Sequence, residues 1–390
     1  MKKTGNVFVA DAQMRSSLAI IRSLGSKGLN VTAGEETSYA TGLFSKYCHN
    51  KKIYPSPYRE PNTFIQYILD EVKINQYDVI FPVTPATVLP IVKRMDEFSK
   101  HTVVPYPKYE ILSRAMDRIE TFRSAQENGI PCPKTYFMGR FGDKGFENVS
   151  GTIEFPVAIK PAASSSNEAI ICDSIQEFAQ KCKQADKEYG SFLIQEILPT
   201  GGEIGVYTLF DARSKPLALS VQKKIRSYPP ESGSSTLRET VKNETAVNLA
   251  IKLLTSMKWT GLAMVEYATD PRDGVLKLLS VNPHVWGSLQ LSILAGVDFP
   301  YLLYRMALGE EIEPNLSYKT GIKCRWLLPG DLLWYLATPG KLKNLSSLVT
   351  LNTADDIMSL SDPGPTMGFI MAAAKYFSDK EMLDQLMSRL

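Results

Sequence analysis

The amino-acid sequence predicts an α/β protein assembled from more than one packed unit. The chain has 390 residues, and single hydrophobic cores stop growing at about 250–300 residues, so two or three units are expected. Residues 5–112 read as alternating strands and helices, which is the pattern of a parallel α/β sheet. A hydrophobic fraction of 44% and a charged fraction of 22% are ordinary for a folded globular protein.

The first unit is predicted over residues 1–112. Strands are expected at residues 6–10, 30–33 and 78–82, and helices at 16–26 and 63–74. The first turn from strand to helix, Ala10 to Arg15, contains no glycine. The close backbone approach that a GxGxxG turn offers to a pyrophosphate is therefore missing, which disfavours a dehydrogenase-type cofactor site.

The rest of the chain divides into a small unit, a larger unit and an extension. A helix at 113–128 should end at Asn128-Gly129, because the Pro131-Cys132-Pro133 run that follows cannot continue it. Two strands, at 157–160 and 192–195, flank a helix at 175–188, and we assign these segments to a lid within 113–196. Strands at 205–210 and 216–222, a Ser/Pro/Gly-rich loop at 227–235 and a helix at 238–257 belong to a larger unit, 197–316, and residues 317–390 form an extension.

A predicted hairpin in the larger unit carries the sharpest spacing argument. Strands at 262–268 and 275–281 flank the turn Asp270-Pro271-Arg272-Asp273-Gly274. A turn centred on Asp273 places Glu266 opposite Ser280. Because side chains alternate along a strand, Asn282 then shares their face. The result is an oxygen-rich corner suited to a hard cation such as Mg²⁺.

Charge and cysteine usage exclude several classes of protein. The 44 Lys and Arg residues against 41 Asp and Glu give a net charge of only +3, which disfavours nucleic-acid binding. No apolar run approaches the roughly 18 residues that cross a bilayer, so we expect no membrane association and a cytoplasmic location. The five cysteines form no CxxC pair, and neither a disulfide framework nor a zinc site is expected.

Several short motifs follow one another in a fixed order along nearly the whole chain. They are Asp117-Arg118, Ala158-Ile159-Lys160-Pro161, Gln195-Glu196-Ile197 with Glu203 beyond it, Val265-Glu266-Tyr267, and Val281-Asn282-Pro283 followed by Trp286-Gly287-Ser288. As a set they resemble the ATP-grasp superfamily, in particular the carboxylate–amine ligases related to the large chain of carbamoyl phosphate synthase. The resemblance implies an ATP-grasp fold with an N-terminal Rossmann-like parallel α/β domain, a small α+β lid and a larger α+β domain. It also implies ATP and Mg²⁺ as cofactors, held between the lid and the larger domain.

The resemblance assigns the phosphates of ATP to the lid. Lys160 closes a lid strand and would place its ammonium on the α and β phosphates, although an ordinary strand-end lysine is the alternative. Arg118 stands where the family has a lysine. The family's glycine-rich phosphate loop is replaced by a segment that includes Ser164, Ser165 and Ser166, which can still offer hydroxyls and backbone N–H groups.

The resemblance assigns the nucleoside to the segment after the lid. Glu196 would accept a hydrogen bond from the adenine amino group, and the backbone of Ile197 and Leu198 would supply the edge-on hydrogen bonds. Glu203 resembles the acid that binds the ribose. The alternative for each glutamate is a solvated carboxylate, because glutamate is mostly exposed.

The metal and catalytic residues depart from the family pattern. Glu266 and Asn282 are the expected Mg²⁺ ligands, but Ser280 stands where a second glutamate is normal, and a hydroxyl is a poorer ligand. His284 replaces an arginine thought to steady the transferring phosphoryl group; a histidine satisfied by neighbouring backbone is the alternative. Arg226, in the basic loop after the central strand, is a further candidate for contact with phosphate or carboxylate.

Three functions are therefore open. The first is an ATP-dependent ligase that joins a small-molecule carboxylate to a small-molecule amine through an acyl phosphate. The second is a nucleotide-binding regulatory or partner protein that has lost turnover, and Ser280 and His284 are the residues that suggest it. The third is another ATP-dependent enzyme on the same scaffold. Many relatives are homodimers, but no feature of this sequence marks an interface.

Overall fold

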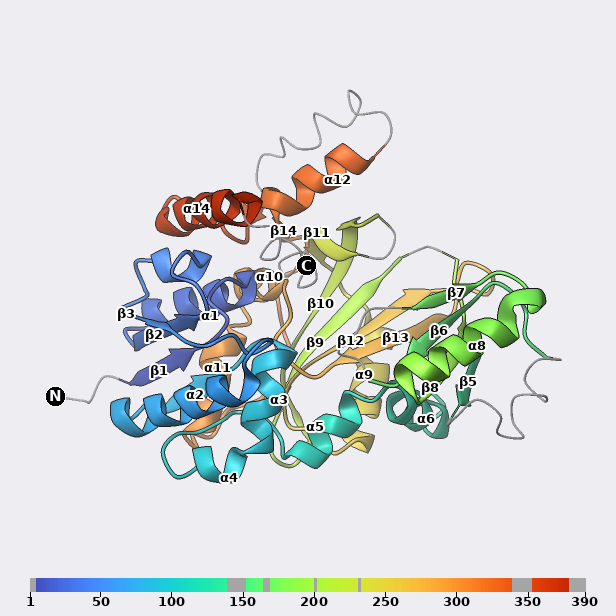
Figure 1. The fold of residues 1–390 in the computed structure, drawn as a ribbon, viewed down its shortest axis with the longest axis horizontal. Coiled ribbons are helices and arrows are strands. Elements are labelled where there is room, and N and C mark those ends of the chain that lie inside the picture. The colour runs from blue at the N-terminus through green and yellow to red at the C-terminus, as the bar shows by residue number, and fades with distance from the viewer. Residues whose placement is uncertain are drawn as a thin grey trace.

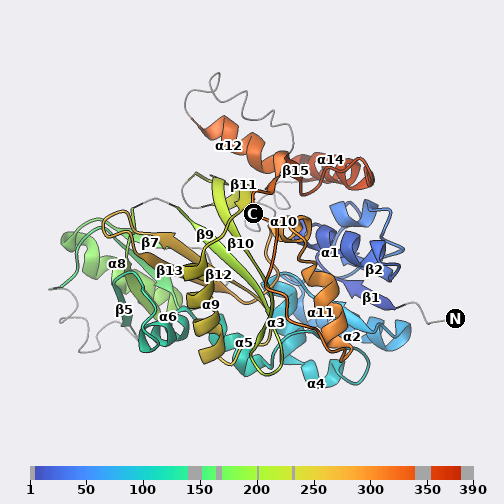
Figure 2. The same cartoon turned by 180° about the vertical axis from the view of Figure 1, so that it is seen from behind.

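The computed structural model describes residues 5–138, 152–163, 169–199, 202–230, 233–338 and 353–378, so the predicted phosphate-loop residues Ser164, Ser165 and Ser166 lie outside the described residues. Three sheets organise these residues. An N-terminal α/β unit and a small lid lie at opposite ends of the molecule, with a large sheet between them, and the C-terminal helices lie across one side (Figure 1). Figure 2 shows the same arrangement from behind.

The N-terminal unit is built on a four-stranded parallel sheet in the order β3-β2-β1-β4. Its elements are β1 (Asn6–Val9), α1 (Arg15–Ser26), β2 (Asn30–Glu35), the 3₁₀ turn η1 (Thr41–Phe44), β3 (Asn50–Ile53), α2 (Pro61–Asn75), β4 (Val79–Phe81), α3 (Pro85–Lys93) and α4 (Met95–Phe98). The predicted alternation of strands and helices is confirmed. The first turn is held by Asp11, whose carboxylate accepts from the Thr84 N–H at 2.8 Å and from the Thr87 hydroxyl at 2.6 Å.

The lid is a four-stranded antiparallel sheet in the order β5-β8-β6-β7, covered by one helix. Its elements are β5 (Thr135–Met138), β6 (Val157–Pro161), β7 (Ile170–Cys172), α8 (Ile175–Tyr189) and β8 (Phe192–Glu196). Phe178 and Cys182 of α8 are buried against Ile159 and Phe192 of the sheet. This small separate core lets the lid fold as a compact layer above the cavity.

The helix predicted at 113–128 is divided in two, α5 (Tyr109–Ala115) and α6 (Arg118–Glu127). The break is caused by Asp117, whose carboxylate accepts from the N–H groups of Ile119 and Glu120 and so caps α6. The Arg118 N–H also donates to the Ala162 carbonyl at 2.7 Å. The start of α6 is therefore tied to the end of the strand that carries Lys160.

The large sheet has seven strands in the order β13-β12-β9-β10-β11-β14-β15. Its first five strands are β9 (Ile204–Phe210), β10 (Pro216–Tyr228), β11 (Ser234–Thr240), β12 (Gly261–Thr269) and β13 (Leu276–Asn282), with α9 (Glu244–Ser256) between β11 and β12. The predicted loop at 227–235 is shorter than expected, because β10 runs on to Tyr228. The helix predicted from residue 238 begins only at Glu244, where Asn243 caps it by accepting from the Ala246 N–H.

The C-terminal residues add an edge to the large sheet and then pack on the N-terminal unit. After α10 (Leu289–Leu294) and α11 (Phe299–Ala307) come β14 (Lys323–Arg325), η2 (Leu327–Asp331), α12 (Leu332–Ala337), β15 (Ala354–Asp355) and α14 (Gly364–Ser378). The predicted limit at residue 316 thus falls within one seven-stranded sheet. Arg22 of α1 bonds Asp362 at 2.9 Å, just before α14. Within the described ranges, no helix has both the length and the apolar character needed to cross a membrane.

Candidate active site

A cavity of about 1430 Å³ lies where the lid, the large sheet, the N-terminal unit and the C-terminal residues meet. Ligand pockets usually measure about 300–1,000 Å³, so this cavity has room for more than one small ligand. Its walls carry Lys160 from the lid, Glu203 and Glu266 from the large sheet, Arg15 from the N-terminal unit and Trp326 from the C-terminal residues. Every part of the fold therefore contributes to one site.

The lid brings two cations together at the roof of the cavity. The ammonium of Lys160 donates to Gln195 Oε1 at 2.8 Å, and in the described part of the chain it meets no carboxylate. Burial, and after it the positive charge of Arg118, lower the pKa of Lys160 to about 8. Arg118 donates to the carbonyls of Pro161 and Ala163 at 3.0 and 2.8 Å. A polyanion between lid and sheet would relieve the repulsion between these cations.

The segment after the lid, which sequence analysis assigned to the nucleoside, lines the same cavity at Glu196, Ile197 and Leu198. The Glu196 carboxylate already accepts from the Lys134 N–H at 2.8 Å and from Arg272 at 2.9 Å. Burial raises the pKa of Glu196, but these hydrogen bonds and the charge of Lys277 outweigh it and hold the pKa below its usual range. The Glu196 carboxylate is therefore already hydrogen-bonded. The groups of this segment that can bind a nucleotide base are the backbone N–H and carbonyl groups of Ile197 and Leu198.

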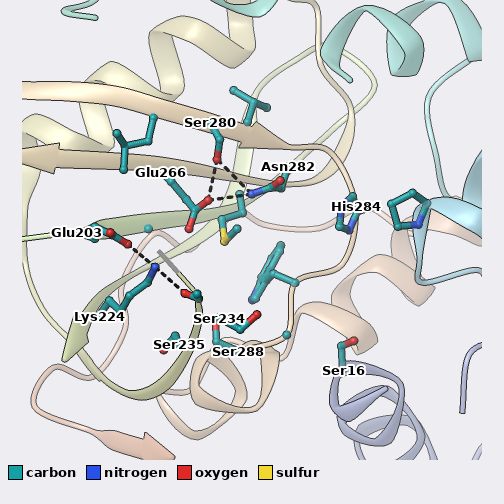
Figure 3. Close-up of a pocket in the computed structure, with 18 of the residues that line it drawn as sticks. Ser16, Glu203, Lys224, Ser234, Ser235, Glu266, Ser280, Asn282, His284 and Ser288 are labelled. Carbon is teal, nitrogen blue, oxygen red and sulfur yellow. Dashed lines mark hydrogen bonds and ion pairs between the residues drawn. The ribbon is translucent and has the colours of Figure 1, made fainter. Parts of the chain in front are cut away.

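Glu203 and Lys224 form an ion pair on the floor of the cavity, between the start of β9 and the neighbouring strand β10. The Lys224 ammonium also donates to the Gly233 carbonyl at 3.2 Å, and its backbone N–H donates to the Glu203 carbonyl at 3.0 Å. Figure 3 shows the pair beside the hairpin strands. Glu203 is held in place, as a residue that orients a hydroxyl-rich ligand must be.

The hairpin corner has the predicted register. Glu266 on β12 pairs with Ser280 on β13, and Met264 pairs with Asn282. The Ser280 hydroxyl donates to Glu266 Oε2 at 2.7 Å, and the Asn282 amide donates to the same oxygen at 3.1 Å (Figure 3). Three oxygen-bearing side chains thus converge on one point of the cavity wall. They fit a hard cation that keeps several waters, as Mg²⁺ does, because one carboxylate and two neutral groups leave most of the coordination shell to other oxygens.

The described residues contain no cluster of three or more His, Cys, Asp or Glu that could hold a metal ion by itself. A cation at this corner would therefore depend on oxygens that a bound ligand supplies. Asp270 is already engaged elsewhere: it accepts from Arg272 and from Lys277, at 2.5 and 2.6 Å. The hydrogen bond from Arg272 holds the pKa of Asp270 well below its usual range.

Comparison with known proteins accounts for this arrangement of lid, sheet and corner. A family model described as "ATP-grasp in the biosynthetic pathway with Ter operon" matches residues 190–328, which include β9 to β13 and the hairpin corner. The fold resembles that of biotin carboxylase from Campylobacter jejuni, solved as a β-γ-ATP complex, with a TM-score of 0.66 and 14% identity over 82% of this chain and 74% of that chain. The chain therefore has an ATP-grasp fold.

Two ligases are also similar to this protein. D-aspartate ligase from Enterococcus faecium (strain Aus0004) is 24% identical over 208 residues, which are 49% of this chain and 49% of that protein. The match therefore spans about half the length of that curated relative. L-amino acid ligase from Bacillus licheniformis has a TM-score of 0.59 and 16% identity over 80% of this chain and 78% of that chain.

The two residues that the sequence predicts to be catalytic, His284 and Arg226, have different positions relative to the cavity. His284 lines the cavity, and its Nδ1 lies 2.9 Å from the Val285 carbonyl. Burial lowers the pKa of His284, so the ring is neutral at pH 7. If Nδ1 donates this bond, Nε2 is left as an acceptor and does not supply the positive charge of the family's arginine. Both interpretations from the sequence therefore hold in part: the ring is held by backbone, and it lies in the wall of the site.

Arg226 is not among the described residues that line the cavity, and its contact with phosphate or carboxylate stays a prediction. Its guanidinium bonds Asp331 at 3.5 Å and stacks on the Trp334 ring at 4.4 Å from the ring centroid. The cause is a bulge in β10: Lys224 pairs with Arg238, but Arg226 pairs with Leu237, so the side-chain alternation is shifted. Lys224 faces the cavity, and Arg226 faces the C-terminal residues.

Two cavity-lining arginines were missed from the sequence. Arg15 is the first residue of α1, and Arg238 lies in β11; both bond the buried carboxylate of Asp356, Arg15 at 3.1 Å. Arg15 lies at the carboxyl end of β1, where ligands of parallel α/β sheets gather, and that signal could have found it. Arg238 was missed because the sequence predicted a helix at 238–257, whereas the residue lies in β11.

Proposed function

We propose that this protein is an ATP-dependent ligase that joins a carboxylate to an amine. The observation that carries the proposal is that one cavity brings together the lid cations Lys160 and Arg118 and the corner formed by Glu266, Ser280 and Asn282. A triphosphate between them would meet positive charge from the lid and a cation site from the sheet. The similarity to D-aspartate ligase and L-amino acid ligase supports carboxylate–amine ligation within this superfamily.

In the proposed reaction, a carboxylate oxygen attacks the γ-phosphorus of ATP. The bond from that phosphorus to the β–γ bridging oxygen breaks, ADP leaves, and an acyl phosphate forms. A neutral amine then attacks the acyl carbon, the acyl carbon–oxygen bond breaks, and phosphate leaves with its electron pair. The proton lost by the amine goes to water or to the departing phosphate, and the product is an amide.

The chain's own residues have separate tasks in this scheme. Lys160 and Arg118 hold the phosphates, the backbone of Ile197 and Leu198 binds the base, and Glu203 binds the ribose. Mg²⁺ at Glu266 and Asn282 would offset charge on the β and γ phosphates. The lid excludes water, which an acyl phosphate requires because it hydrolyses readily. His284 presents a neutral ring to the cavity and orients the ligand by a hydrogen bond.

Positional isotope exchange tests the first chemical step without knowledge of the amine. ATP labelled with ¹⁸O at the β–γ bridge is incubated with the protein, Mg²⁺ and a panel of carboxylic acids that includes D- and L-aspartate. Reversible acyl phosphate formation moves the label into non-bridging positions of the β-phosphate. We expect exchange with at least one acid, its loss in Lys160→Ala, and normal exchange in Lys181→Ala, a matched change at a lid lysine that does not line the cavity. Absence of exchange with every acid would refute the ligase.

The second candidate function is nucleotide binding without turnover, and Ser280 is the observation that favours it. A corner with one carboxylate binds Mg²⁺ more weakly than one with two. Calorimetric titration with ATP separates the two functions. ATP binding that is equally tight with and without Mg²⁺, together with no isotope exchange, would support the regulatory protein.

A further inference from the structure

Beyond the nucleotide site, the cavity contains a second concentration of positive charge that no step above uses. Arg238 is 1% exposed and Arg15 is largely buried, and both guanidinium groups bond one carboxylate, that of Asp356. Asp356 does not line the cavity, whereas both arginines do. Two positive charges thus share one negative charge behind them, and one positive charge remains unbalanced in a buried wall. Such a charge is costly unless a ligand pairs with it.

The hydrogen-bonding groups of this wall are also incomplete. Within the described residues, Nε and Nη1 of Arg238 are buried without a hydrogen-bond partner. The same is true of the indole N–H groups of Trp286 and Trp326 and of the Ser235 hydroxyl. Buried donors are nearly always satisfied in folded proteins, and each one that is not reduces stability. All four of these residues line the cavity.

Three of these residues are tied to Arg15: Trp326 and Ser235 by direct contact, and Arg238 through Asp356. The Arg15 guanidinium stacks on the Trp326 ring at 4.3 Å from the centroid, and it donates to the Ser235 carbonyl at 3.1 Å. Gly287, the neighbour of Trp286, approaches it so closely that an added Cβ would lie 2.8 Å from Arg15 Nη2. Arg15, Arg238, Trp326 and Ser235 therefore lie in one part of the cavity wall, and Gly287 brings the chain at Trp286 to the same part.

We propose that Arg15 and Arg238, with the indole N–H groups of Trp286 and Trp326 and the Ser235 hydroxyl, bind a carboxylate group of the acceptor substrate. The uncompensated charge is one, which matches a carboxylate better than a phosphate dianion, and an arginine fork matches the planar carboxylate geometry. Assigning this ligand as a substrate of the enzyme rests on the proposed function. The substrate class is thus an amine or acid that carries a carboxylate distinct from the phosphates of ATP, as amino acids do.

The pocket and the metal corner line the same cavity, with Tyr207 of β9 between them. Burial raises the pKa of Tyr207, the charge of Glu266 also raises it, and the charges of Arg238 and Arg15 lower it. A substrate held by Arg15 and Arg238 therefore shares the cavity with Glu266, where the γ-phosphate is expected. The C-terminal residues complete the pocket through Trp326 and Asp356, which gives them a role in choosing the substrate.

The pocket can be tested without knowing the substrate. Crystals of the full chain are soaked in sodium bromide, and bromide is located by its anomalous scattering. We expect an anomalous peak between Arg15 and Arg238 that disappears in Arg238→Gln and in Arg15→Gln. Arg15→Gln is included so that the prediction can still be tested if Arg238→Gln does not fold. Absence of bromide from this pocket in the wild type would overturn the proposal.

A second measurement distinguishes a substrate site from an adventitious ion only. Amino acids that support ADP release are compared with their carboxamide counterparts. We expect the carboxamides to have a KM at least tenfold higher, and Arg15→Gln to raise the KM of the acid tenfold while the KM of ATP stays within about twofold. Equal use of acid and carboxamide would overturn the proposal even if bromide binds. Loss of ATP binding itself would contradict the proposed function and leave the bromide result to decide the pocket.

Discussion

Glu266 and Ser280 face each other across β12 and β13, and the Ser280 hydroxyl donates to Glu266 Oε2 at 2.7 Å. The pairing leaves one carboxylate where two would bind Mg²⁺ more tightly. It also removes a repulsion, because two carboxylates directly opposite on neighbouring strands destabilise a sheet. Ser280 thus stabilises the corner in the absence of a metal and lowers the affinity of the corner for a cation.

Ser280→Glu should reverse this balance. Without metal we expect a free energy of unfolding lower by about 1 kcal/mol, because like charges then face each other. With millimolar Mg²⁺ the variant should regain that stability, because a hard cation prefers carboxylate oxygens. Thermal unfolding with and without Mg²⁺ measures both effects. Ser280→Gln is the matched control and should show neither; a Mg²⁺-insensitive Ser280→Glu would mean that no cation binds at this corner.

Lys160 should make ATP binding depend on pH. The pKa of Lys160 is about 8, below the 10.5 of a free lysine, so its ammonium in the folded apoprotein loses a proton at a lower pH than an ordinary lysine does. ATP favours the charged form, and binding between about pH 8 and 10 therefore takes up a proton. We expect a steady Kd below pH 7.5 and a Kd that rises up to tenfold per pH unit above pH 8.

Calorimetry in buffers of different ionisation enthalpy measures this proton uptake directly. Lys160→Arg is the control, because a guanidinium stays charged throughout this range. The variant should bind ATP without taking up a proton. Identical uptake in the variant would show that another group titrates.

The unsatisfied indole N–H of Trp326 should have a measurable energetic signature. Trp259 is also buried, but its Nε1 donates to the Gly261 carbonyl at 3.3 Å. Replacement by Phe removes a bonded donor at Trp259 and an unbonded one at Trp326. We therefore expect Trp326→Phe to cost about 1–2 kcal/mol less than Trp259→Phe in urea unfolding of the apoprotein. Equal costs would show that Trp326 has a partner in solution.

The sequence predicted the parts of this site that depend on local periodicity. Glu266 faces Ser280 as counting from a turn centred on Asp273 predicts, although a bulge between Glu266 and Tyr267 separates this register from that of the residues nearer the turn. The split between α5 and α6 was missed because the Asp117 cap lies inside an otherwise helical pattern. The direction of Arg226 could not be predicted, because a β-bulge shifts the side-chain alternation after Lys224 and leaves no clear mark in one sequence.

The arginine pocket could not be found from the sequence because its members are far apart in the chain. Arg15, Arg238 and Asp356 belong to three different units, and only the packing of β11 against α1 and the C-terminal residues brings them together. No spacing rule relates them. The proposed nucleotide site, in contrast, follows the order of motifs along the chain, so its candidate residues could be named from the sequence.

Gly287 should be required for the acceptor pocket and not for the fold. A Cβ at this position would lie 2.8 Å from Arg15 Nη2 and 2.9 Å from Arg15 Nε. The guanidinium is the far end of a flexible side chain, so it can move away at little cost in stability, but it then leaves its contacts with Ser235 and Trp326. We expect Gly287→Ala to keep Tm within about 2 °C and to raise the KM of the carboxylate substrate about tenfold.

A double-mutant cycle with Arg15→Gln separates this effect from a general change in the loop. If Gly287→Ala acts by displacing the Arg15 guanidinium, it should have almost no further effect once that guanidinium is gone, because the two changes then remove the same interaction. The KM of ATP is the internal control and should stay within twofold in all three variants. Additive effects on the substrate KM would mean that Gly287 acts on the ligand directly and that Arg15 is not its means.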